Sequence, residues 1–275
     1  MTRQFGSRTW CLLKYAIYSL LALGVLLPLL YVVLNSVTPL EDIGKYVFFP
    51  RRLSLRNFQV VLFQTPFFRY MKNTVFLAVV ITAGNALLCS MAAYGFARIR
   101  FPGRQVFFMI IVATLVIPGE VLIIPQYVLV SALSWVDSYL AIIMPALASA
   151  FNIFFLRQYF LGLPAELDES ARIDGCGRHR IYWSILLPLV KTPLITVSLL
   201  TFFGVWDGFL WPLTVINSPE KHVLQVAISL LNTETFTDIG AQFSNVVLSS
   251  LPIVVLFLCM QKYYVAGITS GAVKE

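Results

Sequence analysis

The chain has 275 residues, of which 59% are hydrophobic and only 12% are charged, whereas soluble domains contain about 45–50% apolar and about 25% charged residues. This composition excludes a soluble globular fold and predicts an all-α integral membrane protein. The formal net charge of +7 does not indicate nucleic-acid binding, because no basic face on a soluble fold is visible.

A membrane-spanning helix needs about 20 apolar residues, because the hydrocarbon core is about 30 Å thick. Six segments of the chain meet or nearly meet this length while containing at most one charged residue. We therefore expect one transmembrane domain over residues 1–275 with six spans, at about residues 15–35, 73–97, 106–130, 138–157, 192–213 and 240–261.

The first expected span follows three basic residues, Arg3, Arg8 and Lys14. Its apolar run is too long for a secretory signal and no small-x-small cleavage site follows, so we expect an uncleaved helix. Lys and Arg in short loops resist translocation. They gather before the first span, between the second and third, and around the loop after the fourth, which predicts that both termini are cytoplasmic.

The loop over residues 36–72 is the exception, since six spans place it outside although it contains six basic residues. Its basic character fits an anionic ligand, a binding-protein surface or a plain surface loop. The third span contains one carboxylate, Glu120, beside Pro118 and Gly119, which predict a kink or break there. An acid inside a membrane is a functional candidate, although Glu120 could instead lie near the outer interface where water reaches it.

A polar segment over residues 164–193 interrupts the apolar pattern after the fourth span. Pro164 suits a first helical position, and three acids in the following turn favour a helix N-terminus. Asp168 and Arg172 share one face, and Gly175 suits a left-handed stop. Apolar residues at helical spacing then continue to Pro188. We expect a helix, a glycine bend and a second helix that insert into a partner's cleft. The simpler alternative for the whole segment is a solvated loop with helix caps. The simpler alternative for Glu169 is that it only stabilises the helix dipole at the N-terminus.

This segment resembles the EAA loop of the permease subunits of ATP-binding-cassette importers, whose pattern is Glu-Ala-Ala, a glycine four residues on, and Ile-x-Leu-Pro. The resemblance implies a cytoplasmic loop, here residues 164–188, that docks into a groove on a separate ATPase subunit and passes its ATP-driven closure to the membrane helices. Ser170 replaces the middle alanine and keeps a small side chain. The residues at the positions of the motif are Glu169, Ser170, Ala171, Gly175, Ile185, Leu187 and Pro188.

Three further segments resemble the carbohydrate-uptake class of these permeases, in particular the shorter permease of maltose-type importers. They are the turn at residues 117–120, the run at 206–213 and the C-terminal stretch at 261–274. The resemblance covers most of the chain after about residue 70. Aromatic faces stack on sugar rings and carboxylates accept hydroxyl hydrogen bonds, so the candidates for lining the substrate pathway are Glu120, Trp206, Asp207 and Trp211, although two tryptophans near a span's end also fit an interfacial belt.

Nothing in the sequence indicates that this chain performs chemistry. A phosphate-binding loop ending in Gly-Lys-Ser/Thr is absent, the four cysteines are far apart, and His179 and His222 have no partner at metal-ligand spacing. We therefore expect no catalytic residue, metal or cofactor on this chain, with ATP and Mg on partner subunits. The resemblance implies an ATPase dimer, a second homologous permease, an extracytoplasmic solute-binding protein, and a bacterial or archaeal inner or plasma membrane.

Two other classes are weighed against the importer permease. An ion-driven secondary transporter would use Glu120 and Asp207 as coupling carboxylates, would transport without partners, and would show an inverted repeat that is not evident by eye. A membrane-embedded enzyme would need a nucleophile and base, or a metal cluster, near one face. Neither class requires the polar segment. The cargo of an importer is not specified by these motifs.

Overall fold

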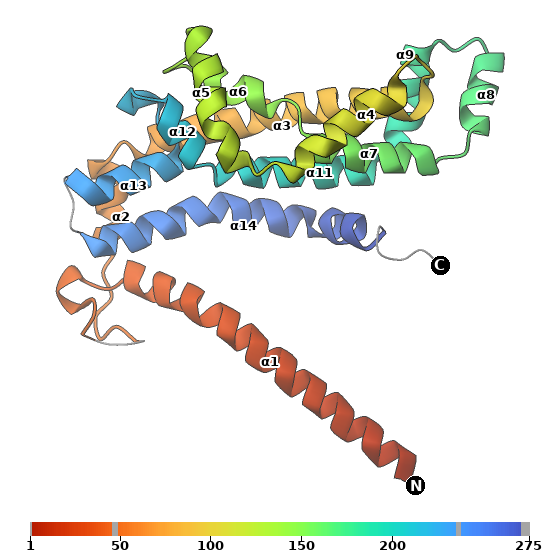
Figure 1. Cartoon of the computed structure of the whole chain (residues 1–275). Helices are drawn as coiled ribbons and strands as arrows, with labels where there is room; N and C mark the ends of the chain where they lie inside the picture. The colour runs from red at the N-terminus through yellow and green to blue at the C-terminus, as the bar shows by residue number, and fades with distance from the viewer. Residues whose placement is uncertain (1, 46–48, 235–237, 271–275) are drawn as a thin grey trace. The chain divides into compact units, whose positions relative to one another are not determined.

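The computed structural model describes residues 2–45, 49–234 and 238–270, and within these ranges all regular structure is helical. Side chains of residues 262–270, together with residues 271–275, lie outside the described part, and so does most of the C-terminal stretch at 261–274 that carries the resemblance. In chain order the main helices are α1 (Thr2–Ser36), α2 (Arg56–Gln59), α3 (Phe67–Arg98), α4 (Arg104–Ala113), α5 (Ile123–Ala132), α6 (Leu140–Ala146), α7 (Ala150–Gly162), α8 (Glu166–Ile173), α9 (Arg178–Arg180), α10 (Leu187–Leu189), α11 (Lys191–Trp206), α12 (Leu210–Val215), α13 (Leu224–Glu234) and α14 (Ile239–Ser270) (Figure 1).

Six short helices complete the list: η1 (Leu40–Asp42), η2 (Val60–Gln64), η3 (Thr114–Val116), η4 (Gly119–Leu122), η5 (Ile181–Leu186) and η6 (Pro219–Lys221). Four segments are long and apolar enough to cross a membrane as they stand: Leu13–Ser36, Phe67–Arg98, Leu140–Gly162 and Ile239–Gln261. Two helix pairs qualify only as bent spans, Arg104–Val116 with Gly119–Ala132 and Arg178–Leu189 with Lys191–Trp206. The described chain therefore holds four to six candidate spans.

The bend in the third apolar segment lies where Pro118 and Gly119 predict it. The helix stops at Val116, resumes at Gly119, and turns by 101°. Pro118 is extended, with φ −60° and ψ 135°. The third apolar segment is therefore two helical pieces joined at a sharp bend, and not one straight helix.

The fourth and fifth apolar segments are less regular than the sequence predicts. The fourth is broken between α6 and α7, with Pro145 one residue before the end of α6. The fifth ends at Trp206, and α12 begins only at Leu210. Pro212 explains the second break, because it has no N–H to donate to residue 208 in a continuous helix but fits the first turn of a new one.

The chain divides into two compact units, one from residues 1–68 and 228–252 and the other from residues 69–227 and 253–275. In the first unit, Asn57 is fully buried, and its Nδ2 donates to the carbonyls of Ser36 (3.1 Å) and Thr38 (2.8 Å). Ser244 Oγ donates to the same Ser36 carbonyl (3.0 Å). These bonds tie the end of α1 to α2 and to the start of α14.

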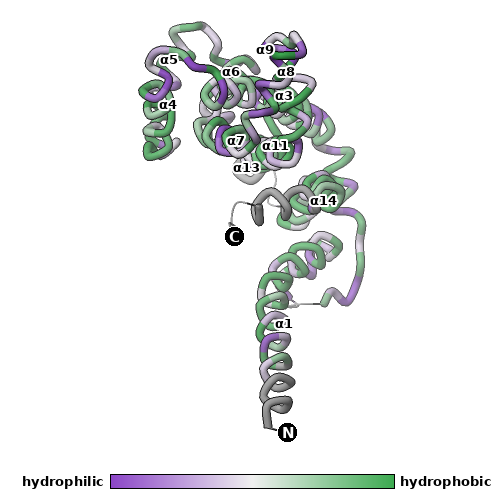
Figure 2. The backbone as a smooth tube through the Cα atoms, turned by 90° about the vertical axis from the view of Figure 1, so that its right-hand side faces the viewer, coloured by the Kyte–Doolittle hydropathy of each residue, from purple (hydrophilic) through white to green (hydrophobic). Residues whose placement is uncertain are grey.

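The second unit contains two hydrophobic clusters along α3. One gathers the C-terminal half of α3 with α7, α8, η5 and α11, and includes Ala93, Leu156 and Ile181. The other joins the N-terminal half of α3 with α5, α6, α12 and α13, and includes Leu77 and Val226. Figures 1 and 2 both show α3, α7 and α11 side by side, so α3 forms the axis of this unit.

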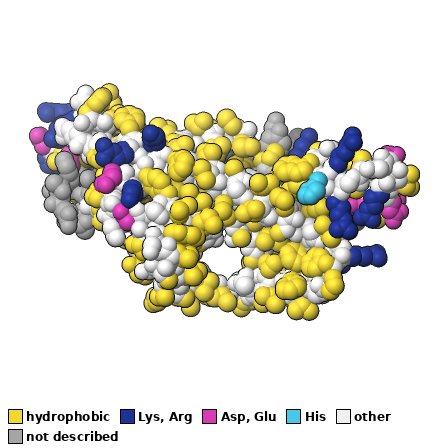
Figure 3. Space-filling view, turned by 90° about the horizontal axis from the view of Figure 1, so that it is seen from above, with side chains coloured by type: hydrophobic (Ala, Val, Ile, Leu, Met, Phe, Trp, Pro, Cys, Tyr) yellow, Lys and Arg dark blue, Asp and Glu magenta, His cyan; other side chains and the backbone are white. Residues whose placement is uncertain are grey.

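Polarity changes sharply at one end of the second unit. The backbone is coloured as hydrophilic at α8 and α9 and as hydrophobic along α4 (Figure 2). Charged side chains gather at both ends of the visible face, one of which carries α8 and α9, while hydrophobic side chains cover most of the middle (Figure 3). The polar segment at residues 164–193 therefore forms one of the charged regions of this unit.

Candidate functional site

Helix α8 is a short acidic helix that presents two different faces. Asp168 and Ala171 are buried, with exposed fractions of 5% and 4%, whereas Glu169, Ser170 and Ile173 are exposed. The helix starts at Glu166, two residues after Pro164, with its acids in the first turn where the helix dipole favours them. One face of α8 is thus fixed to the protein and the other is open to a partner.

Gly175 ends α8 as the sequence predicts. Its φ is +77°, its N–H donates to the carbonyl of Arg172 (3.0 Å), and the N–H of Cys176 donates to that of Ala171 (2.9 Å). This pair of bonds is a Schellman motif, which needs a left-handed residue at this position. No atom lies within 4 Å of where a Cβ would stand, so the constraint on residue 175 is its backbone conformation alone.

The chain then returns toward the spans through α9, η5 and α10. Ile181, Tyr182 and Leu186 are fully buried, and Ile185 and Leu187 are half-buried. The second helix that the sequence predicts is present, but its central turn, η5, is a π-helix. Its buried side belongs to the cluster that contains the end of α3, so the segment is packed against α3 on both sides of Gly175.

A buried ion pair fastens α8 to the last turn of α3. Arg98 Nη1 lies 3.2 Å from Asp168 Oδ2, and the two side chains are only 11% and 7% exposed. Arg98 Nη2 also donates to the carbonyl of Leu163, just before α8. The sequence analysis placed Asp168 on one face with Arg172 and did not predict a contact with Arg98. A pair so far apart in the chain leaves no local pattern.

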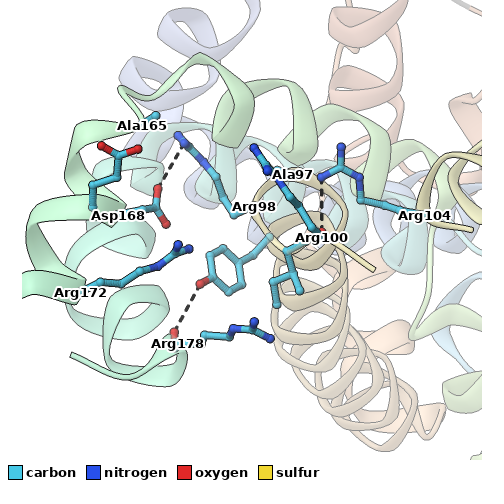
Figure 4. A pocket seen from close by; sticks show the side chains of 11 residues that line it. Ala97, Arg98, Arg100, Arg104, Ala165, Asp168, Arg172 and Arg178 are labelled. Carbon is cyan, nitrogen blue, oxygen red and sulfur yellow. Dashed lines mark hydrogen bonds and ion pairs between the residues drawn. The ribbon is translucent and has the colours of Figure 1, made fainter. Parts of the chain in front are cut away.

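A polar cavity of about 580 Å³ opens beside this ion pair (Figure 4). Figure 4 shows Arg172 and Arg178 facing it from the α8 and α9 side, with Arg98 and Arg100 on the α3 side. Five arginines line it against two acids, Asp168 and Glu169. The cavity is therefore electropositive and lies beside α8, where Asp168 belongs to the fixed face and Glu169 to the open face.

The four residues predicted to line a substrate pathway occupy dissimilar positions. Trp206 is 1% exposed and stacks on Phe202 with ring centroids 5.7 Å apart. Trp211 is half-buried and donates its indole N–H to the carbonyl of Ala141 (3.0 Å). Glu120 and Asp207 are exposed, the first in η4 and the second at the end of α11. Both tryptophans thus have packing roles.

A carboxylate that the sequence did not single out holds two loops together. Asp137 has φ +59° and accepts hydrogen bonds from the backbone N–H groups of Asn217 (3.0 Å) and Ser218 (2.9 Å), from Ser218 Oγ, and from Lys221 Nζ (2.9 Å). The bonds from Ser218, followed by the one from Lys221, hold the pKa of Asp137 far below its usual range. The segment between α5 and α6 is thereby fixed to that between α12 and α13.

Among the described residues, no group of three His, Cys, Asp or Glu is placed to hold a metal ion. The four cysteines are unpaired. Cys89 instead lies on α3 beside the break between α6 and α7, where its Sγ accepts from the N–H of Ser149 (3.3 Å).

Comparisons with known proteins place these features in context. Residues 84–270 match the family described as binding-protein-dependent transport system inner membrane component. The chain is 34% identical over 262 residues to the arabinooligosaccharides transport system permease protein AraQ of Halalkalibacterium halodurans, covering 94% of both proteins. It is 36% identical over 209 residues to the sn-glycerol-3-phosphate transport system permease protein UgpE of Yersinia pestis, covering 75% of this chain and 74% of that protein.

A solved structure is also similar, that of a bacterial ABC transporter involved in the import of the acidic polysaccharide alginate. The TM-score is 0.85 at 25% identity, over 94% of this chain and 98% of the other. The similarity therefore extends over nearly the whole fold.

Proposed function

The chain belongs to the family of binding-protein-dependent transport system inner membrane components, and on that basis we propose that it is one permease subunit of an ATP-binding-cassette importer for a carbohydrate or related solute. Relatives of 30% identity or more that span most of the chain are named as permeases for arabinooligosaccharides and glycerol 3-phosphate. The chain is a multi-pass membrane protein with apolar helices. Hydrolysis of ATP belongs to partner subunits.

Residues 164–188 form the coupling loop of this importer. The observation that carries this proposal is the division of α8 into a face buried against α3 through Asp168 and Ala171 and a face left open through Glu169 and Ser170. In this proposal the open face meets the ATPase. Displacement of α8 is passed to α3 by the Arg98–Asp168 ion pair. The angle at which the chain returns from α8 toward the spans is set by Gly175, Ile185, Leu187 and Pro188.

The complete transporter in this proposal contains a second homologous permease, an ATPase dimer and an extracytoplasmic solute-binding protein. In the proposed topology the chain has six spans, two of them bent, and the coupling loop and both termini lie in the cytoplasm. The binding protein then meets the opposite side. Alternating access follows when closure of the ATPases rocks the helices attached to the coupling loop.

An ion-driven transporter has less support. Glu120 and Asp207 would have to bind a coupling ion, yet each is exposed at the end of a different helix and neither has an ion-pair partner within the described residues. The buried contacts of α8 have no role in that mechanism.

Affinity purification from the native membrane in mild detergent tests the assembly. We expect an ATPase, a second permease and a binding protein to co-purify, with ATP hydrolysis that the loaded binding protein stimulates. Recovery of this chain alone, active in uptake driven by an ion gradient, would refute the importer.

A further inference from the structure

Three uncharged polar side chains meet in the middle of the second unit. Asn152 of α7 donates through Nδ2 to Asn85 Oδ1 of α3 (2.7 Å) and to Thr201 Oγ1 of α11 (2.9 Å). Asn85 and Asn152 are only 2% and 3% exposed. Asn85 and Asn152 lie near the middle of the candidate spans Phe67–Arg98 and Leu140–Gly162. We call Asn85, Asn152 and Thr201 the mid-span polar cluster.

The cluster sits where a span is interrupted. Residues 147–149 separate α6 from α7. Asn85 Nδ2 donates to the carbonyl of Ala146 at the end of α6 (2.8 Å), and Ser149 Oγ accepts from the N–H of Asn152 at the start of α7 (3.3 Å). Interrupted helices at membrane depth occur where the backbone is buried in protein or lines a water-filled cavity.

An open cavity of about 390 Å³ lies at this interruption. Its lining includes all three members of the mid-span polar cluster together with Ser149, Phe151 and Leu200, and none of its eight lining residues is charged. The two hydrogen bonds that Asn152 Nδ2 donates go to Asn85 Oδ1 and Thr201 Oγ1. No described residue donates a hydrogen bond to Asn152 Oδ1. Hydrocarbon cannot satisfy such a group, so the cavity is suited to face an aqueous path and not lipid.

We propose that this cavity is a solute subsite and that it takes an uncharged, hydroxyl-rich molecule such as a neutral oligosaccharide or polyol. Amide and hydroxyl groups can both donate to and accept from sugar hydroxyls, and the aromatic ring of Phe151, which is 45% exposed, offers a surface for a sugar face. A solute with a phosphate or carboxylate group would find no cationic side chain in the lining to neutralise it. Removing such an unpaired anion from water costs much free energy. This inference rests on the proposed importer function and selects among the solute classes of its relatives.

Cysteine accessibility tests the subsite without knowledge of the natural solute. Thr201→Cys in the assembled, membrane-embedded complex is treated with methanethiosulfonates bearing an uncharged hydroxyethyl, an anionic sulfonatoethyl or a cationic trimethylammonium group. We expect the hydroxyethyl reagent to react at least tenfold faster than the sulfonatoethyl reagent. Ser198→Cys is the matched control, because Ser198 lies on the same helix, bonds only the carbonyl of Leu194 (2.7 Å) and does not line the cavity.

Two outcomes overturn the proposal. An anionic reagent that reacts as fast as the uncharged one contradicts the solute class. Absence of any modification above the Ser198→Cys control, with and without ATP, contradicts an aqueous cavity. ATPase co-purification is measured on the same preparation, so a complex that is assembled and hydrolyses ATP but fails these tests leaves the importer function standing.

A second variant links the subsite to transport. Thr201→Val keeps the shape of the side chain and removes the hydroxyl that accepts from Asn152. Uptake of a neutral probe, arabinotriose, by this variant is compared with uptake by Ser198→Ala. A fall of about fivefold to tenfold, the size of one lost hydrogen bond, with unchanged ATP hydrolysis supports the proposal. Unchanged uptake, or wild-type transport of glycerol 3-phosphate but not arabinotriose, refutes it.

Discussion

Gly175 controls the direction in which the chain leaves α8. Its φ of +77° is costly for a residue with a Cβ, by about 1–2 kcal/mol. The space around it is empty, so a larger residue is opposed by backbone strain and not by a clash. Changes at this position should therefore alter the angle of the coupling loop while leaving the spans folded.

Gly175→Val is expected to reduce solute uptake strongly while ATP hydrolysis by the complex continues. Gly175→Asn should retain most uptake, because asparagine tolerates the left-handed conformation. Gly177→Ala is the matched control, since Gly177 lies two residues away with φ −70°. Uptake and ATP hydrolysis are measured together in proteoliposomes. Normal uptake by Gly175→Val would contradict the role given to the bend.

Arg98 and Asp168 form the direct charged contact between α8 and α3. Asp168→Asn removes one charge and leaves Arg98 buried without its partner, a change that costs about 3–5 kcal/mol at buried pairs. We expect less uptake per ATP hydrolysed, together with a lower melting temperature of the complex. Glu166→Gln, which changes an exposed acid in the same turn, should behave as wild type.

Exchanging the charges of Arg98 and Asp168 tests whether uptake depends on their ion pair or falls only because each single change destabilises the protein. Arg98→Asp combined with Asp168→Arg should recover part of the uptake that either single change loses. Additive damage in the double variant would show that the two side chains do not act as a pair.

At the scale of elements, Asp137 joins the segment between α5 and α6 to the segment between α12 and α13. Its pKa is held below the ordinary value of 3.8, so ionised Asp137 stabilises the fold fully above that value and loses this effect as the pH falls toward its folded-state pKa. Asp137→Asn should lower the melting temperature by an amount that stays constant between pH 8 and pH 5. Glu220→Gln, an exposed acid in the same loop, serves as control, and a difference that shrinks within this range would contradict the account.

The extent to which the sequence predicts the elements depends on whether the signal is local. The start of α8, its stop at Gly175 and the bend at Pro118 follow from residues that act on their immediate neighbours. The stop and the bend were predictable, and the start was predicted to within two residues, since α8 begins at Glu166 and not at Pro164. The break between α6 and α7 falls within an uncharged run, so the span signal does not reveal it. The contacts that organise the site are equally hidden, since Asn85 and Asn152 are 67 residues apart and neither residue alone marks a pair.

At the scale of the whole molecule, the described chain leaves much of its apolar surface uncovered. In the span of α1, none of the apolar window is buried within the structure, and Leu20 and Val25 are 72% and 68% exposed. A helix that is apolar all round faces lipid or another subunit. This exposure agrees with a chain that functions within a membrane assembly.

The charge at one end of the second unit also suits an assembly. The coupling loop combines exposed acids on α8 with the arginines that line the cavity beside it, so a partner must complement both signs. In the proposed transporter that partner is the ATPase, and the mid-span polar cluster lies on the route between it and the opposite side of the membrane.

The measurement that tests the central claim most directly is photo-crosslinking from α8 in the assembled complex. Ile173 is 86% exposed and is replaced by a benzoylphenylalanine residue, with the same replacement at Leu133, 46% exposed in the segment before α6, as the control. The account predicts that position 173 crosslinks to an ATPase subunit in a nucleotide-dependent manner and that position 133 does not. A crosslink from position 173 to the solute-binding protein, or an ATPase crosslink from position 133 only, would contradict it.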